Sequence, residues 1–348
     1  MRSTLVFLLA AVLTLAACSP GGQPVPEATT DDGGQGPGWF GGYVDVTLTP
    51  GYLLHHRPAV QGTPVLSFVS SDPHRPCEPS WGGTYGLDLA NEKLELDAQV
   101  ESFRKAGGSI GVSFGGQRGT ELAVACPDVD SLTGAYAAVI DRYRPDVVDL
   151  DIEGAGASDA AAAERRAAAV ARLQAARPAG DPLRVWLTLP VSRDGLTPAA
   201  ELSVQTMLGA GVDVAGVNVM TMNFGPLPAG QSMRDASVQA AEATHRALAA
   251  LFAKNGLPTG NSAVWHRIGL TPMIGVNDVE GNVLSLADAE ALEAFAAERG
   301  LGRMSMWSLN RDVACEAPQD GATHSCSGVQ QEPGMFAEVL GRSFTGLP

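Results

Sequence analysis

The sequence has few lysines, few aromatic residues and no block rich in Lys and Arg. Lysine occurs only as Lys93, Lys105 and Lys254, and aromatic residues make up 6% of the 348 residues. The formal net charge is −15. Proteins that bind nucleic acid neutralise phosphates with clustered basic side chains, so the composition argues against a nucleic-acid partner and against a basic face that adsorbs to anionic lipid. Neutral substrates suit this surface better than anionic ones.

The apolar run near the N-terminus is too short to cross a bilayer. It extends from Leu5 to Leu13, whereas a membrane-spanning helix needs about 20 apolar residues. Arg2 precedes it and Leu15-Ala-Ala-Cys18 follows it, which is the pattern of a secretory signal. The ending resembles the lipobox of bacterial lipoproteins, so we expect residues 1–18 to be a lipoprotein signal peptide with Cys18 lipidated. An ordinary signal peptide with an incidental Cys is the alternative.

Residues 19–37 contain almost no large apolar side chains and are rich in Gly, Pro, Asp and Thr. Such a segment buries too little surface to fold, and we expect a disordered tether. The protein is then exported, and either secreted or anchored by its N-terminal lipid to the bacterial cell membrane, facing the extracellular side. This lipid would be its only contact with the membrane.

Eight short apolar or β-branched segments alternate with longer helical segments from residue 39 onward. This alternation over about 300 residues fits a single-domain α/β fold, a (β/α)8 TIM barrel over residues 38–348. A doubly wound sheet is the alternative, but it would require a Gly-rich phosphate-binding loop after the first strand. Gly41-Gly42 lies inside that strand and not in a loop. The predicted strands are Trp39–Leu48, Pro64–Val69, Ser109–Phe114, Val147–Ile152, Arg184–Leu189, Val214–Met222, Arg267–Met273 and Met304–Leu309. The predicted helices include Leu89–Lys105, Ala135–Tyr143 and Ala160–Ala176, with N-caps at Ser158 and Ser285 and C-caps at Gly107-Gly108 and Gly300.

Four cysteines remain when Cys18 is set aside, an even number that suits an oxidising compartment. Three pairings are possible. We favour Cys77–Cys126 and Cys315–Cys326, because each pair then lies in loops that the predicted fold brings together. The sequence has no Cys-x-x-Cys pair and its six His do not have the spacing of metal ligands, so we expect neither a metal nor a cofactor.

The strongest chemical signal is the segment Asp146-Val-Val-Asp-Leu-Asp-Ile-Glu153. Side chains alternate along a strand, so Asp149, Asp151 and Glu153 share one face, and we expect that face to point into the barrel near the carboxyl end of the fourth strand. Three close carboxyl groups cannot all ionise cheaply, so one retains a proton and can act as a general acid. The alternatives are a Mg²⁺ or Ca²⁺ site and an inert acidic face of a sheet.

These residues fit the D-x-x-D-x-D-x-E signature of glycoside hydrolase family 18, the chitinase and endo-N-acetylglucosaminidase family. Three further segments resemble motifs of that family in the expected order: Ser113-Phe-Gly115-Gly116 at the third strand, Met220–Gly225 at the sixth and Met306-Trp307-Ser308 at the eighth. Together they span most of residues 39–312. The resemblance implies a retaining glycosidase that cleaves β-1,4 linkages of N-acetylglucosamine polymers, with chitin or chito-oligosaccharide as its partner.

The resemblance also assigns roles within the acidic strand. Glu153 would protonate the glycosidic oxygen, and the substrate's own 2-acetamido carbonyl would attack the anomeric carbon, since this family is an exception to the scheme with two catalytic carboxylates. Asp151 would orient the acetamido N–H. Asp149 would share a proton with Asp151, whereas Asp146 has the opposite parity and is structural.

Several other residues are candidates for sugar binding. We expect Trp307 to form the floor of the subsite for the distorted sugar, Trp81 and Tyr85 to line an outer subsite, and Asp45 to approach the acidic cluster. Ser113, Gly115 and Gly116 would contribute through the third-strand motif. Trp39 and Trp265, at the starts of strands, are expected to be core residues at the bottom of the barrel.

The sixth strand departs from the family pattern. Many members have Tyr and Asp where this chain has Met222 and Asn223, so a hydroxyl that aligns the acetamido carbonyl is missing, although Asn223 can still hold the sugar. Reduced activity or a shifted substrate follows, and a catalytically weak chitin-binding lipoprotein and an endo-β-N-acetylglucosaminidase are alternatives. About 30 residues separate the seventh and eighth strands, which favours an open groove and endo action. We expect a monomer that ends in a helix near Met335–Leu340.

Overall fold

The computed structural model describes residues 36–54 and 62–348. The predicted signal peptide, Cys18 and residues 19–35 of the predicted tether lie outside the described residues and stay predictions. The described residues from 36 onward belong to one compact unit, Gly34–Pro348.

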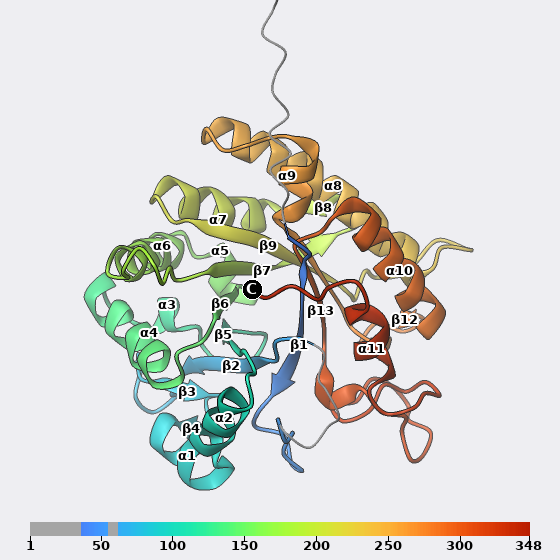
Figure 1. Ribbon diagram of the computed structural model, residues 1–348, viewed down its shortest axis with the longest axis horizontal. Coiled ribbons are helices and arrows are strands. Elements are labelled where there is room, and N and C mark those ends of the chain that lie inside the picture. Colours follow the sequence, from blue (N-terminus) through green and yellow to red (C-terminus); the bar gives the residue numbers. More distant parts are fainter. Residues whose placement is uncertain (1–35, 55–61) are drawn as a thin grey trace, which may run out of the picture. The chain divides into compact units, whose positions relative to one another are not determined.

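Eight parallel strands form a closed barrel at the centre of this unit (Figure 1). Seven successive pairings lead from β2 through β5, β6, β7, β9, β10 and β13 to β1, and β1 also pairs with β2, which closes the ring. The predicted (β/α)8 barrel is therefore confirmed. The barrel strands are β1 (Trp39–Asp45), β2 (Val65–Ser71), β5 (Gly111–Gly115), β6 (Val147–Asp151), β7 (Val185–Ser192), β9 (Val214–Thr221), β10 (Ile268–Pro272) and β13 (Arg303–Met306).

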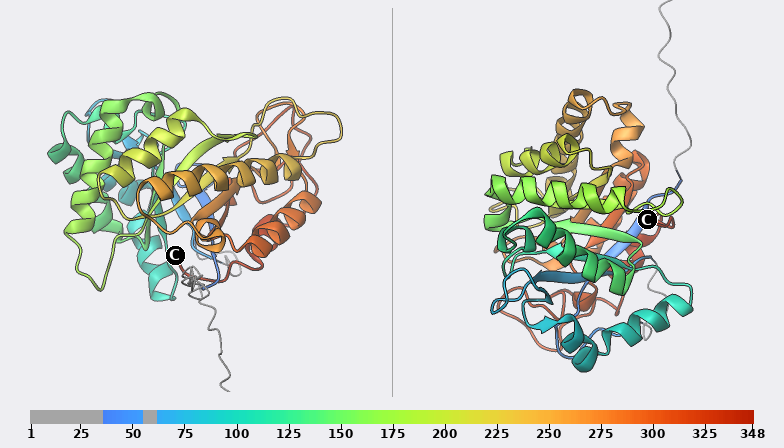
Figure 2. Two further views of the ribbon diagram at one scale, coloured as in Figure 1. Left: turned by 90° about the horizontal axis from the view of Figure 1, so that it is seen from above. Right: turned by 90° about the vertical axis from the view of Figure 1, so that its left-hand side faces the viewer.

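Helices surround the strands, as Figures 1 and 2 show. They are α1 (Leu87–Leu94), α2 (Leu96–Lys105), α3 (Leu122–Ala125), α4 (Val129–Tyr143), α5 (Gly154–Ser158), α6 (Ala160–Ala175), α7 (Pro198–Gly209), α8 (Met233–Lys254), α9 (Asn261–His266), α10 (Leu286–Arg299) and α11 (Met335–Gly341), with a 3-10 turn at Leu309–Arg311. Short strands extend the loops: β3 (Pro79–Trp81) and β4 (Tyr85–Gly86) beside β2, β8 (Gly195–Leu196) beside β7, and the hairpin of β11 (Gly275–Val276) and β12 (Val283–Leu284). None of the helices in the described part of the chain has the length and apolar composition of a membrane span.

Helix boundaries follow the capping chemistry, with two corrections to the predictions. The capping box at Ser285 and the left-handed C-cap at Gly300 are both present. Ser158, however, ends α5, and the cap of α6 is Asp159, whose carboxylate accepts a hydrogen bond from the Ala162 N–H at 2.9 Å. The helix predicted over 89–105 is two helices, because Glu95 has a left-handed backbone (φ 52°) that ends α1 and begins α2.

Two separate clusters of buried residues lie on the two sides of the sheet. The larger one contains the outward side chains of the strands and the helices that cover them. The smaller one lies within the ring and contains Trp39, Tyr43, Val65, Val147 and Trp186. The rings of Trp39 and Trp186 meet edge to face at 5.9 Å, so the prediction that Trp39 is a core residue is confirmed.

Trp265 is a core residue as well, but it lies in α9 and not at the start of a strand. It stacks on His245 and packs against Phe295.

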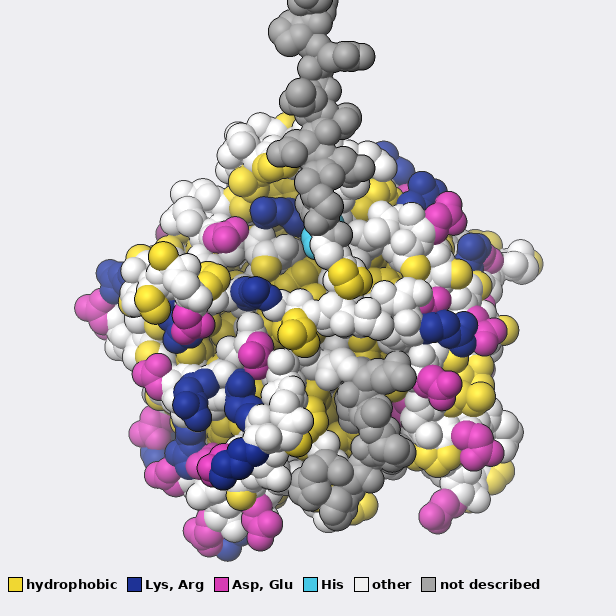
Figure 3. Space-filling view, in the orientation of Figure 1, with side chains coloured by type: hydrophobic (Ala, Val, Ile, Leu, Met, Phe, Trp, Pro, Cys, Tyr) yellow, Lys and Arg dark blue, Asp and Glu magenta, His cyan; other side chains and the backbone are white. Residues whose placement is uncertain are grey.

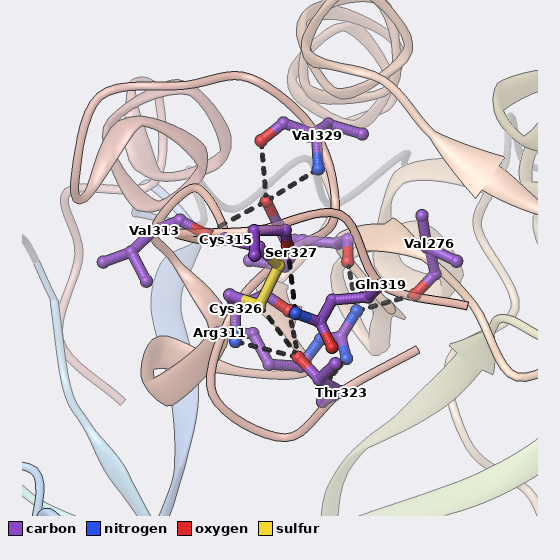
Figure 4. Close-up of a disulfide and its surroundings, with 11 residues drawn as sticks. Val276, Arg311, Val313, Cys315, Gln319, Thr323, Cys326, Ser327 and Val329 are labelled. Atoms are coloured by element: carbon purple, nitrogen blue, oxygen red, sulfur yellow. Dashed lines mark hydrogen bonds between the residues drawn. A yellow bond between two sulfur atoms is a disulfide. The ribbon is translucent and has the colours of Figure 1, made fainter. Parts of the chain in front are cut away.

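Both predicted disulfides are present. Cys77–Cys126 joins the loop after β2 to the end of α3, and Cys315–Cys326 closes a loop before α11. Buried Arg311 donates to the carbonyl groups of Thr323, Ile274 and Val276, so it ties this loop to the segment after β10 (Figure 4). The predicted C-terminal helix is confirmed as α11.

Charged groups of opposite sign are mixed on the face of the molecule that Figure 3 shows. Ion pairs on the surface include Arg104–Asp146 and the contacts of Arg142 with Asp88 and Asp97. Asp146 also accepts a hydrogen bond from the backbone of Ile110, in keeping with its predicted structural role.

Candidate active site

The acidic strand β6 directs its carboxyl groups into the barrel. Asp149 and Asp151 are buried, whereas Val148 and Leu150 belong to the outer hydrophobic cluster. Glu153 follows as the N-cap of α5, is half-buried, and hydrogen-bonds to Asp151. The three carboxyl groups therefore share the inward face that the alternation predicts.

Asp149 lies deepest and has a hydrogen-bond donor for every acceptor position. Its Oδ2 accepts from the Tyr43 hydroxyl at 2.9 Å and from Ser113 Oγ at 2.7 Å. Its Oδ1 accepts from Thr188 Oγ1 at 2.6 Å and from Arg303 Nη1 at 2.6 Å. Four donors from four other strands thus converge on a single carboxylate.

Arg303 forms a fully buried ion pair with Asp149, and both side chains are 0% exposed. The guanidinium lies over the Trp39 ring, 4.6 Å from its centroid, and near the rings of Tyr43 and Trp186. Burial lowers the pKa of Arg303, but Tyr43 and Asp149 raise it more, so the pKa lies above its ordinary value. Arg303 is therefore a permanent cation beneath the acidic cluster.

Asp151 and Glu153 form a coupled pair above Asp149. Burial, the charges of Glu153 and Asp149, and a hydrogen bond from Glu153 raise the pKa of Asp151 well above its ordinary value. Burial also raises the pKa of Glu153, and the hydrogen bond with Asp151 opposes that rise. The two carboxyl groups are therefore coupled, and the raised pKa of each favours a proton shared between them. The resemblance predicts that Asp151 shares its proton with Asp149, whereas in the structure its hydrogen-bonding partner is Glu153.

The residues of the third-strand motif support the acids and are not aimed at a substrate. Ser113 is fully buried and donates to Asp149. Gly115 passes so close to β6 that a Cβ atom would lie 2.0 Å from the Asp151 carbonyl oxygen. Gly116 donates its N–H to that oxygen at 3.0 Å, and a Cβ atom there would lie 2.6 Å from the Phe68 ring. The two glycines allow this close approach, since both have positive φ.

Aromatic rings lie beside the acids at the open end of the barrel. Trp307 is half-buried and stacks on Phe68, with ring centroids 5.4 Å apart. Tyr43 touches both rings and reaches Asp149 with its hydroxyl. Trp307 and the acids therefore belong to one site, and Phe68 is an additional half-buried ring in it.

The end of β9 is held by the segment after β11. The amide of Asn223 donates to Asp278 at 3.0 Å and accepts from the Asp278 N–H at 3.0 Å. Met222 is half-buried and has the same parity as Asn218, which lies within the barrel and donates to Thr188. Met222 therefore has the parity of the inward residues of β9, whereas the Asn223 amide serves to fix the loop.

Three predicted sugar-binding residues have other partners. Trp81 is fully buried and its indole N–H donates to the Tyr143 hydroxyl at 3.2 Å, so the prediction that it lines an outer subsite is wrong. Tyr85 is half-buried and pairs with Trp81 across β3 and β4. The Asp45 carboxylate accepts from the backbone and side chain of Thr47, so it stabilises the turn after β1 and has no hydrogen bond to the acids.

Two known proteins resemble most of this chain in sequence. A probable bifunctional chitinase/lysozyme of Escherichia coli (strain K12) is 33% identical over 279 residues, which cover 79% of this chain and 31% of that protein. Endochitinase 11 of Metarhizium anisopliae is 33% identical over 280 residues, which cover 78% of this chain and 52% of that protein. The chain thus matches about a third and about half of the length of these relatives. No family model matches the chain.

The fold is similar to a solved catalytic domain. The catalytic domain of the hyperthermophilic chitinase from Pyrococcus furiosus superimposes on this chain with a TM-score of 0.76 and 27% sequence identity. The match covers 88% of this chain and 95% of that domain. The barrel is chitinase-like.

Sequence reasoning missed four residues of this chitinase-like site: Tyr43, Arg303, Thr188 and Phe68. Arg303 has a sequence signal, because Arg303, Ser305 and Trp307 alternate with Met304 and Met306, although the predicted strand begins one residue later, at Met304. Thr188 has the same kind of signal beside Trp186 on β7. Phe68 has none, because the register of β2 shifts between Leu66 and Val69.

Proposed function

We propose that this chain hydrolyses β-1,4 linkages in N-acetylglucosamine polymers with retention of configuration, and that Glu153 is its general acid. The observation that carries the proposal is the hydrogen-bonded pair of Asp151 and Glu153 at the open end of the barrel, in which burial raises the pKa of both carboxyl groups. A carboxyl group with a raised pKa that is still partly exposed suits proton donation to a leaving sugar. A catalytic-site mutant of the Pyrococcus furiosus domain was solved with chito-oligosaccharides, which supports this substrate class.

The proposed reaction has two steps. Glu153 donates its proton to the glycosidic oxygen as the bond to the anomeric carbon breaks, and the 2-acetamido carbonyl oxygen attacks that carbon to give an oxazolinium ion. Water then adds to the same carbon as the bond from the acetamido oxygen to that carbon breaks, and the water returns a proton to Glu153. Asp151 Oδ1 is buried and has no hydrogen-bond partner in the described part of the chain, so it is available to accept the acetamido N–H.

The aromatic and sixth-strand residues set the strength of substrate binding. Trp307 and Phe68 offer ring faces on which the C–H groups of a pyranose can stack. Met222 cannot donate a hydrogen bond to the acetamido carbonyl. Loss of one such donor costs about tenfold to thousandfold in rate, judged from oxyanion-hole donors, so we expect a slow enzyme.

The short connection between β10 and β13 supports endo action. It contains the hairpin of β11 and β12 and the helix α10. Few residues are then left to form an additional wall along one side of the substrate groove. A long polymer could then bind across the barrel. Met222 and the occupied Asn223 amide favour a second candidate, a protein that binds N-acetylglucosamine oligomers with little turnover.

Glu153→Gln tests the proposal, with release of a fluorophore from chitobiose and chitotriose glycosides as the assay. General acid catalysis contributes about 10²–10⁴-fold, so we expect activity to fall by that factor. Glu164→Gln is the matched control, because Glu164 is exposed on α6. Oligosaccharide binding by the wild type without turnover between about pH 4 and pH 8 would favour the second candidate.

A further inference from the structure

We propose that the buried ion pair of Glu121 and Arg166 positions the general acid, because it holds the short helix α5 that begins directly after Glu153. The inference rests on the proposed function for the role of Glu153. The Arg166 guanidinium donates from Nε to Glu121 Oε1 at 2.5 Å and from Nη2 to Glu121 Oε2 at 2.7 Å. Nη2 also donates to the carbonyl oxygen of Gly156, in α5, at 3.3 Å. Both residues therefore act on Glu153 through the backbone of α5.

Helix α5 has little packing surface of its own. Its sequence is Gly-Ala-Gly-Ala-Ser, and only Gly156 and Ala157 are buried. A helix of five small residues is too short to be stable alone, and its glycines disfavour it further. The Glu153 carbonyl accepts the Ala157 N–H at 3.3 Å, so the backbone of the acid belongs to the first turn of this helix. A contact that fixes α5 therefore also fixes the point from which the Glu153 side chain extends.

The ion pair is a rigid support for α5. The side chain of Arg166 is 1% exposed and that of Glu121 is 10% exposed, and two parallel hydrogen bonds fix the plane of the guanidinium. Arginine side chains can hydrogen-bond the last carbonyl groups of a helix, which have no partner within it. Gly156 supplies such a carbonyl. A Cβ atom at Gly156 would lie 2.4 Å from Glu121 Oε2, so this glycine lets α5 lie directly against the pair.

Both members of the pair are anchored outside the acidic strand. Arg166 lies near the middle of the long helix α6. Glu121 is the N-cap residue of α3, and Cys126, which ends that helix, is joined to Cys77 by a disulfide. The support for α5 thus comes from a long helix and from a single helical turn that is covalently tied to the loop after β2.

The dependence of the rate on the leaving group tests whether the pair acts on the general acid. A chito-oligosaccharide needs a proton on its leaving sugar, whereas dinitrophenolate leaves from a dinitrophenyl chitobioside without one. In Gly156→Ala, which keeps both charges, we expect kcat for the oligosaccharide to fall about ten- to hundredfold, because small misplacements of a catalytic group have effects of this size. The chitobioside should react within about threefold of the wild-type rate. KM should change little for either substrate, because Trp307 and Phe68 are unaltered.

Matched variants separate positioning from a general loss of stability. Gly134→Ala makes the same substitution in α4, at an exposed glycine with open space for a Cβ atom, and should leave both rates unchanged. Glu121→Gln removes one charge of the pair and should show the same selective loss as Gly156→Ala. Glu293→Gln removes a buried carboxylate from α10 instead and should show no selectivity. If Glu121→Gln does not fold, Gly156→Ala decides the question.

The outcomes distinguish this inference from the proposed function. Glu153→Gln is the reference and should show the largest selective loss of oligosaccharide cleavage. An equal fall for both substrates in Gly156→Ala, or no fall for either, contradicts the positioning role of the pair while the proposed function stands. Absence of selectivity in Glu153→Gln itself contradicts the proposed function, on which the positioning role rests.

Discussion

Asp149 and Asp151 lie two residues apart on one strand and face the same interior, yet their surroundings are opposite. Asp149 receives four hydrogen bonds and a buried positive charge. Asp151 is 5% exposed, its Oδ1 has no partner among the described residues, and the ionisable group that hydrogen-bonds to it is another acid, Glu153. The same residue type is thus a structural anion in one place and a proton-holding group in the other.

This difference shows that the acid that stabilises the barrel and the acids that can react lie at different depths within it. A buried charge is tolerated where it is paired and fully hydrogen-bonded. An unsatisfied carboxyl with a raised pKa costs stability, and such costs gather at sites that bind and react. The structural anion lies deep within the ring, and the proton-holding pair lies at the end where substrate enters.

The largest expected effect comes from making the same substitution at both positions. Asp149→Asn leaves Arg303 buried without a counterion, and we expect the free energy of unfolding to fall by about 3–5 kcal/mol. Asp151→Asn removes an acid that is held next to like charges, so we expect no loss of stability at neutral pH. Urea unfolding of both variants measures the contrast. Equal stability of the two variants would show that the ion pair is not what distinguishes the sites.

A smaller difference between the two sites should appear in how the free energy of unfolding depends on pH. The pKa of Asp151 is raised in the folded protein, so the stability it contributes is fully present below its unfolded pKa of about 4 and is lost as pH rises through the folded value. Asp151→Asn removes this loss. We therefore expect its stability relative to wild type to increase with pH, by about 1.4 kcal/mol for each unit by which the pKa is raised.

Urea unfolding at a series of pH values measures this difference. Glu164→Gln serves again as the control, because its difference from wild type should not follow the same curve. A difference between Asp151→Asn and wild type that stays constant with pH would show that Asp151 holds no shared proton.

Much of the barrel and part of the site follow from the sequence. Strand periodicity predicts all eight strands and the inward face of Asp149, Asp151 and Glu153, because alternation is a local property. The supporting residues depend on long-range packing. Arg303 is 154 positions from its partner, and nothing in the sequence near either residue specifies which charges meet inside a closed ring.

The positions of the aromatic residues also depend on long-range packing that the sequence pattern does not predict. Trp81 looks like a loop aromatic in the sequence, but β3 pairs with β2 and buries the ring against Tyr143. Phe68 has the outward parity of Leu66, and the irregularity in β2 places it with the interior cluster instead. A shift of one residue in register exchanges the two faces of a strand, so a pattern of alternation cannot identify the ring that stacks on Trp307.

The smallest expected effect comes from the neutral donors to Asp149. Tyr43→Phe keeps the ring that contacts Phe68 and Trp307 and removes one hydroxyl donor. Ser113→Ala removes another. Each should cost about 1 kcal/mol in the free energy of unfolding, measured by urea unfolding, since Arg303 still pairs with Asp149. A loss of stability in Tyr43→Phe as large as that in Asp149→Asn would mean that the hydroxyl donors and not the buried ion pair stabilise this position, and Asp149 would then differ from Asp151 only in its number of donors.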